Sequence, residues 1–98
     1  MIVDTLREEF DNWRKTLPAE TSSNFQELDC PAGVGRAVRL AVATAARAAE
    51  VTVWESGEAD LVVGELSTGG IVANEHIEIT TRVGIRGLLD DIAHVVSV

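Results

Sequence analysis

The segment from residue 48 to residue 79 alternates apolar and polar side chains, and this pattern constrains the fold more than any other feature of the chain. In its first run every second residue is apolar, at Ala49, Val51 and Val53. Two turn sequences, Ser-Gly at 56–57 and Ser-Thr-Gly-Gly at 67–70, divide the segment. We therefore expect strands from about 49 to 54, 59 to 66 and 71 to 79, paired antiparallel because their connections are short.

The third of these strands has a mixed pattern. Its apolar residues on one face are predicted to be Ile71, Ala73, Ile77 and Ile79. Glu75 interrupts that series, which indicates a β-bulge or an open sheet edge there.

Residues 36–50, RAVRLAVATAARAAE, fit two structures. A stripe at helical spacing runs from Arg36 to Glu50, and alanine is the best helix former. As a strand, Val38, Leu40 and Val42 would share one face. A helix here would leave the later strands with fewer partners, so we favour a strand from about 37 to 44 and a turn near 45–47.

Both ends of the chain have helical periodicity. The N-terminal stripe consists of Val3, Leu6, Phe10, Trp13 and Leu17, of which Phe10 and Trp13 are expected to be core residues. Asp4 or Thr5 is the predicted cap of this helix, and Pro18 ends it. The C-terminal helix would be capped by Thr80 or Thr81 and buried through Ile85, Leu88, Leu89, Ile92 and Val96. Gly84 and Gly87 weaken it by about 1 kcal/mol each, so packing must hold it in place.

The segment between the first helix and residue 36 carries weaker signals. We expect a polar loop over 18–24, a short edge strand or irregular lead-in over 25–29, and a turn at Pro31, Gly33 and Gly35. The single cysteine, Cys30, allows no internal disulfide and is expected to be a small buried apolar residue.

Together these patterns predict one domain spanning residues 1–98. We expect an α+β fold with an N-terminal helix, a four-stranded antiparallel β-meander and a C-terminal helix. Both helices would cover one face of the sheet, and the other face would stay in water.

Composition and the lack of known motifs limit the classes of function that the protein can have. The formal charge is −8, from 16 acidic and 8 basic residues, which disfavours binding to nucleic acid or to an anionic membrane and favours a basic protein. No secretory leader and no apolar stretch of about 18 residues is visible, so a cytoplasmic protein is expected. The histidines His76 and His94 lack metal-ligand spacing, and no nucleophile or phosphate-loop motif occurs. We expect no enzymatic activity, no metal and no cofactor.

The charges are segregated along the chain. Residues 48–81 contain no lysine or arginine but seven carboxylates. One interpretation is that these acids serve solubility and protect sheet edges. The other is an acidic docking surface with Trp54 as its anchor, because such charges steer a basic partner and tryptophan is enriched among dominant interface residues. The predicted partner-binding residues are Trp54, Glu55, Glu58, Asp60, Glu75, His76 and Glu78, although Trp54 also fits a lid on the core.

The stretch EVTVWESGEADLVVGELSTGGIVANEHIEI, followed by a short helix, resembles bacterial polymorphic-toxin immunity proteins, specifically the TriTu family. Its most recognisable element is formed by Trp54, Ser56, Gly57 and Glu58. The resemblance spans roughly residues 37–96 and the N-terminal helix. It implies a cytoplasmic, non-enzymatic protein that binds a cognate toxin domain and blocks it. The net charge of −8 favours a basic toxin domain.

Two other functions remain open. Secretion or effector chaperones are also small, acidic and α+β, but they are usually obligate dimers, whereas we expect a monomer or weak dimer. An enzyme built on the open sheet face is the third hypothesis, for which Glu75 and His76 are the candidate residues.

Overall fold

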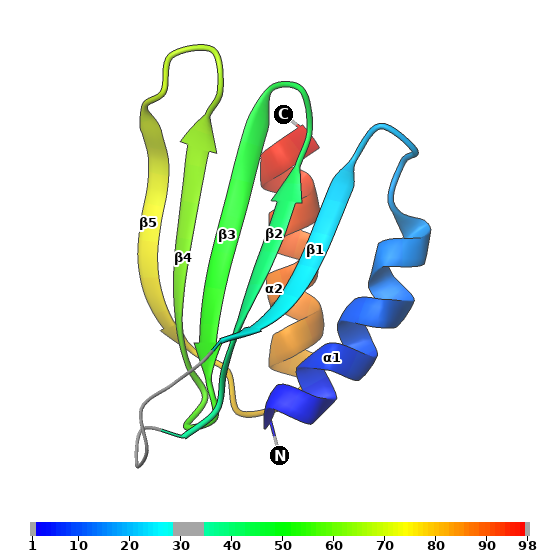
Figure 1. Ribbon diagram of the computed structural model, residues 1–98, viewed down its shortest axis with the longest axis vertical. Coiled ribbons are helices and arrows are strands. Elements are labelled where there is room, and N and C mark those ends of the chain that lie inside the picture. The colour runs from blue at the N-terminus through cyan, green and yellow to red at the C-terminus, as the bar shows by residue number, and fades with distance from the viewer. Residues whose placement is uncertain (1, 29–34, 98) are drawn as a thin grey trace.

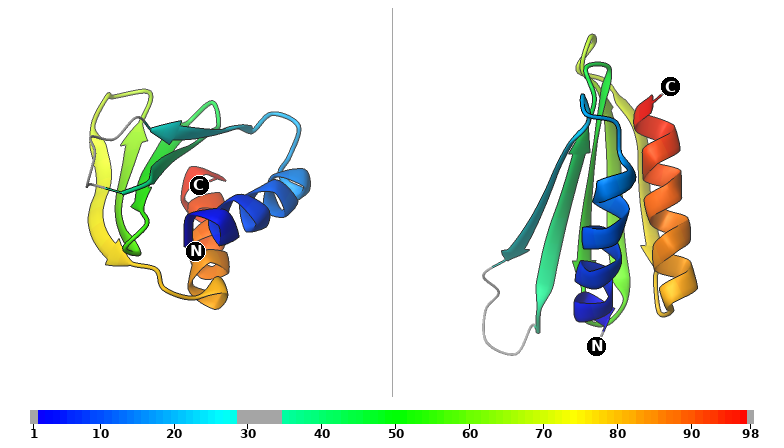
Figure 2. Two further views of the ribbon diagram at one scale, coloured as in Figure 1. Left: turned by 60° about the horizontal axis from the view of Figure 1, so that its bottom comes forward. Right: turned by 90° about the vertical axis from the view of Figure 1, so that its right-hand side faces the viewer.

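The computed structural model describes residues 2–28 and 35–97 (Figure 1). In chain order the elements are α1 (Ile2–Trp13), a 3-10 turn (Arg14–Thr16), β1 (Ser22–Leu28), β2 (Ala37–Ala43), β3 (Arg47–Trp54), β4 (Glu58–Glu65), β5 (Ile71–Glu78) and α2 (Arg82–Ser97). The strands form one antiparallel sheet in the order β1-β2-β3-β4-β5. Both helices lie on one side of this sheet (Figure 2). The predicted α+β fold and the placement of both helices on one face are confirmed.

The sheet has five strands, so the prediction of four was wrong. The additional strand is β1, which agrees with the edge strand considered for residues 25–29 but begins earlier, at Ser22, inside the segment predicted to be a polar loop. It pairs with β2 along its whole length and forms one edge of the sheet. Phe25 connects this strand to the core, with its ring centroid 5.6 Å from that of Phe10.

The alanine-rich segment 36–50 forms strands, as favoured. Val38, Leu40 and Val42 of β2 are each no more than 1% exposed. The turn into β3 closes where the Thr44 N–H donates a hydrogen bond to the Arg47 carbonyl, at 2.9 Å. Burial of this face between sheet and helices outweighs the helix propensity of the intervening alanines.

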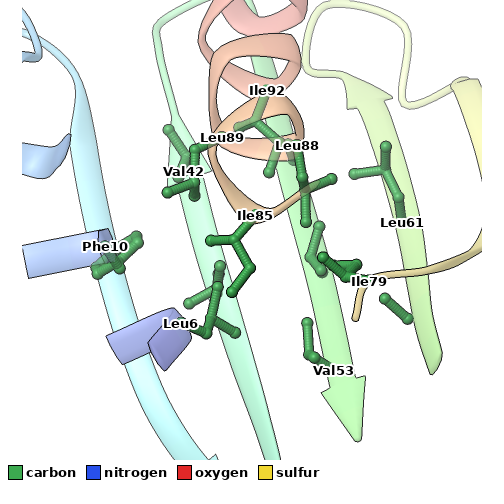
Figure 3. Close-up of a cluster of buried hydrophobic side chains, with 14 of the residues drawn as sticks. Leu6, Phe10, Val42, Val53, Leu61, Ile79, Ile85, Leu88, Leu89 and Ile92 are labelled. Atoms are coloured by element: carbon green, nitrogen blue, oxygen red, sulfur yellow. The ribbon is translucent and has the colours of Figure 1, made fainter. Parts of the chain in front are cut away.

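The core lies between the sheet and the two helices (Figure 3). Ile85, Leu88, Leu89, Ile92 and Val96 form the buried face of α2, as predicted. Thr81 caps this helix, because its Oγ1 accepts a hydrogen bond from the Gly84 N–H at 3.0 Å.

Helix α1 buries Val3, Leu6 and Phe10, and Trp13 packs against the same cluster. The predicted caps were wrong: α1 already includes Ile2, so Asp4 lies within its first turn. Thr5 likewise belongs to the helix and does not precede it.

A buried carboxylate links the two helices. Glu9 of α1 accepts hydrogen bonds from Arg82 of α2 at 2.5 Å and from Arg86 at 3.1 Å, through two nitrogens. These bonds, to Arg86 first and to Arg82 second, lower the pKa of Glu9. The pair of helices is therefore joined by charge as well as by apolar packing.

Strand β5 is the other edge of the sheet (Figure 1). Helix α2 packs mainly over β2 and β3, and the inner side of β4 is also buried, whereas that of β5 is only partly covered. The predicted open edge is confirmed. The register breaks between Val63 and Gly64 and not at Glu75. Ile71 consequently pairs with Gly64 and is 64% exposed, so its predicted place on the apolar face was wrong, whereas Ile79 is buried.

Two further observations complete the description. Cys30, Pro31 and Gly33 lie outside the described residues. None of the described helices is long and apolar enough to span a membrane.

Candidate functional site

The side of the sheet away from the helices is not covered by any described helix or strand (Figure 2). We call this surface the open face. Strand alternation and register place the following side chains on it: Arg39, Glu50, Thr52, Trp54, Glu58, Asp60, Val62, Asn74, His76 and Glu78. Each alternates along its strand with a residue directed toward the helices.

Trp54 lies at the end of β3, where the open face meets the β3–β4 turn. The indole is half-buried and lines a hollow of about 420 Å³ together with Ser56, Glu58, Asp60 and His76. It is therefore neither sealed in the core nor fully in water. A large aromatic surface stands directly beside carboxylates, an arrangement suited to holding an apolar group that carries a positive charge.

The turn after Trp54 is fixed by Gly57. The Gly57 N–H donates to the Trp54 carbonyl at 2.9 Å, and its own carbonyl accepts a hydrogen bond from the Ile79 N–H. Gly57 has φ of 95°, and an added Cβ would lie 2.8 Å from the Ile79 oxygen. The glycine of the Trp-x-Ser-Gly-Glu string is thus required to join the β3–β4 turn to the chain that leads into α2.

His76 lies between two carboxylates of β4. Its Nδ1 is 2.6 Å from Asp60 Oδ1, and its Nε2 is 3.6 Å from Glu58 Oε1. The hydrogen bond to Asp60 raises the pKa of His76, and the nearby Glu58 charge acts in the same direction. When His76 is protonated, its imidazolium offsets part of the local negative charge.

Glu58 and Glu78 are directly opposite each other in the β4–β5 pairing. Like charges at opposed positions destabilise a sheet. Among the described residues, Glu78 has no ion pair with a lysine or arginine. A cation supplied from outside the chain would relieve this repulsion.

Two of the seven predicted residues do not join this group. Glu55 is largely withdrawn from solvent, and its carboxylate lies 4.0 Å from the chain's own Arg36. Glu75 pairs with Leu61 and lies on the helix side of β5. The structure brings Trp54, Glu58, Asp60 and His76 together around one hollow, and Glu78 joins them only as the strand partner of Glu58.

Arg39 also lies on the open face, which the distribution of charges along the sequence did not indicate. It comes from β2, outside the lysine- and arginine-free segment, yet it faces Thr52 in the pairing of β2 with β3. Its Nε lies 3.3 Å from Glu50 Oε1, so it offsets Glu50. Net negative charge on the open face is consequently shifted toward β4 and β5.

A second hollow of about 400 Å³ occupies the other end of the open face. Its floor is formed by small residues, among them Ala41, Ala43, Ala48 and Gly64, with Val62 beside them. Sequence reasoning missed this hollow, although the alternate alanines Ala41 and Ala43 of β2 were its signal. The open face thus offers an apolar hollow at one end and an aromatic, acidic hollow at the other.

The side chains around Trp54 bear on metal binding and on proton transfer. Within residues 2–28 and 35–97, no group of three or more His, Cys, Asp or Glu side chains is placed to hold a metal ion. Ser56 Oγ contacts Glu58, at 3.4 Å from Oε2, and both nitrogens of His76 face carboxylates. The ring nitrogens of His76 are therefore directed at carboxylates and are not oriented to take a proton from the serine.

Comparison with known proteins gives no family assignment: no protein-family model matches the chain, and no curated protein matches it.

Proposed function

We propose that this protein is an immunity-type inhibitor that binds a cationic toxin domain through the open face and blocks it, without catalysis. The observation that supports this is the distribution of unpaired charge. Arg36, Arg82 and Arg86 are engaged by carboxylates of α1, β1 and the β3–β4 turn. Eight acids of the described chain have no lysine or arginine partner, and three of them, Glu58, Asp60 and Glu78, lie on the open face; the other five are Glu20, Glu65, Glu75, Asp90 and Asp91.

Such an imbalance favours a positively charged partner. Carboxylates on one side of a small protein steer a basic protein toward that side and repel acidic competitors. Glu58, Asp60 and Glu78 supply this charge on the open face, and the half-buried Trp54 supplies the apolar anchor beside it. The anchor gives a long-lived complex, and the acids give rapid and selective encounter.

Inhibition would follow from occupation of the toxin's own site. Toxins that act on nucleic acid need a cationic cleft, and an acidic surface competes for it with the phosphate backbone. The inhibitor would act in the cytoplasm of the cell that makes the toxin, as a one-to-one complex.

The direct experiment is co-expression with the toxin domain encoded by the neighbouring open reading frame. We expect a stable one-to-one complex, protection of the expressing cell, and loss of both on Trp54→Ala with the circular dichroism spectrum unchanged. Val83→Ala is the matched control, because Val83 is 77% exposed and lies on the helix side of the molecule. Failure to form a complex, or failure to protect, would contradict the proposal.

A small effector chaperone is the second candidate. It is favoured by exposed apolar residues at the β4–β5 turn, where Leu66 is 54% and Val72 is 44% exposed, next to the exposed Ile71. A chaperone of this kind is usually a stable dimer. Light scattering of the purified chain separates the two functions: a monomer or weak dimer agrees with the inhibitor, and a stable dimer agrees with the chaperone.

A further inference from the structure

A third hollow, of about 440 Å³, lies on the helix side of the sheet between β5 and α2. Leu61 and Leu88 line its base, Ala73 and Ile77 belong to its β5 wall, and Gly87 belongs to its α2 wall. We call it the β5–α2 groove. It exists because the two helices are too narrow a layer to cover five strands, so the inner side of β5 stays half-exposed.

Gly87 keeps this groove open. No atom lies within 4 Å of the position that a Cβ would take at Gly87, whereas at Gly84 a Cβ would meet Ile79 and Thr81 atoms at 3.3 Å. Close packing therefore accounts for Gly84 and not for Gly87. A glycine inside a helix costs about 1 kcal/mol of helix stability relative to alanine. At Gly87 the missing side chain leaves an apolar space of the groove unfilled.

The edge of the sheet runs along the same groove. Among the described strands β5 pairs only with β4, so its other edge presents unpaired backbone groups over eight residues. Extended segments of other proteins bind such edges through main-chain hydrogen bonds, and alternate side chains then enter adjacent pockets.

The charge around the groove selects the partner. Glu75 of β5 and Asp91 of α2 line it, and neither has an ion pair with a lysine or arginine among the described residues. His94 is the one basic side chain in its lining. A second copy of the chain, itself carrying a net charge of −8, would bring the same carboxylates to this edge and be repelled.

We propose that the β5–α2 groove binds an extended cationic segment of another protein, which adds alongside β5 and places apolar side chains over Gly87. Lysine or arginine residues next to those apolar side chains would face Glu75 and Asp91. This surface is on the opposite side of the sheet from Trp54, so the inference goes beyond the proposed function and can stand without it.

A designed nine-residue peptide in which lysine alternates with valine and leucine is the probe, followed by fluorescence polarisation at physiological salt. The comparison peptide has serine in place of every valine and leucine. We expect the apolar peptide to bind about tenfold more tightly, or better, since burial of one or two aliphatic side chains supplies that factor. Equal affinity of the two peptides would overturn the proposal, because charge alone would then explain binding.

Two variants of α2 locate the site. Gly87→Leu fills the groove and should weaken the apolar peptide about tenfold while leaving the melting temperature unchanged or higher, because leucine is the better helix former. Asp90→Leu adds the same side chain to an exposed position of α2 outside the groove and should change affinity less than threefold. Equal effects of both variants, or no effect of Gly87→Leu, would overturn the proposal.

Hydrogen exchange and oligomeric state complete the test. Amides of β5 should exchange more slowly with the peptide bound, and unchanged exchange would exclude strand addition. A dimer of the free chain that Gly87→Leu dissociates would assign the groove to a second copy instead. Trp54→Ala should leave the affinity for the peptide unaltered. The experiments therefore test toxin binding by the open face and peptide binding by the β5–α2 groove independently of each other.

Discussion

Gly57 is the residue at which the β3–β4 turn and the segment leading into α2 meet. Its φ of 95° and the 2.8 Å approach of the Ile79 oxygen to an added Cβ both require glycine. We expect Gly57→Ala to lower the free energy of unfolding by about 2–4 kcal/mol, from backbone strain and the displaced hydrogen bond. Urea denaturation measures this.

Gly69→Ala is the control for that experiment. Gly69 has φ of 71° but no atom within 4 Å of an added Cβ, so only the backbone strain applies. A loss of about 1 kcal/mol is expected there. Equal losses at the two positions would show that contact with the Ile79 carbonyl contributes nothing.

His76 makes stability depend on pH in a defined direction. Its pKa is raised in the folded state by Asp60, so its contribution is fully present below the unfolded pKa, near 6.5, and is lost as pH rises through the folded pKa. Wild type should therefore lose stability relative to His76→Gln as pH rises above about 6.5. Urea midpoints measured below and above that pH test the sign, and a difference that grows with pH would contradict the assignment.

At the scale of the elements, Glu9 should dominate how the helix pair responds to acid. Its pKa is lowered by Arg86 and Arg82, so this contribution is present above the unfolded pKa of about 4.5 and is lost as pH falls through the folded pKa. Glu9→Gln should make the free energy of unfolding depend less on pH below about pH 4.5. Glu8→Gln, whose side chain is more exposed and lies 3.5 Å from Arg82, is the matched control and should alter it less.

The elements differ in how far the sequence predicts them. Stripes such as Leu6 and Phe10 predict helices, and the alternation of Val51 and Val53 predicts a strand, because one face of each is buried. Strand β1 is harder to predict, since only Phe25 ties its polar sequence to the core. The bulge opposite Gly64 arises from pairing between strands, which no single segment encodes.

At the scale of the molecule, the lysine- and arginine-free segment indicated which acids lie near Trp54. Of the seven residues predicted from it, Trp54, Glu58, Asp60, His76 and Glu78 lie on the open face. Arg39 and the alanine hollow were missed because β2 brings them to the open face from elsewhere in the chain. Glu55 was misplaced because alternation stops at the end of β3, where its carboxylate approaches Arg36.

Glu58 and Glu78 oppose each other on the open face, so a change that relieves their repulsion should raise stability and weaken binding of a cationic partner. Glu78→Lys replaces a like-charge pair with Glu58 by an opposite-charge pair and should raise the free energy of unfolding by about 0.2–1 kcal/mol. The same change should slow association with a cationic partner. Glu20→Lys, in the turn before β1, changes net charge equally and should do neither. If Glu78→Lys is stabilised but still binds as fast as wild type, the Glu58–Glu78 pair does not contribute to binding.

The most direct measurement is the rate of association with the cognate toxin domain, by stopped-flow fluorescence over a series of salt concentrations. Two triple variants carry the same change in net charge: Glu58→Lys, Asp60→Lys and Glu78→Lys on the open face, and Asp11→Lys, Glu20→Lys and Asp90→Lys away from it. At 0.1 M salt the open-face variant should associate at least about tenfold more slowly, and its rate should depend much less on salt. The matched variant should change far less, because charges more than about 10 Å from the partner are screened at that salt concentration. Equal slowing by the two variants, or none in either, would contradict docking on the open face.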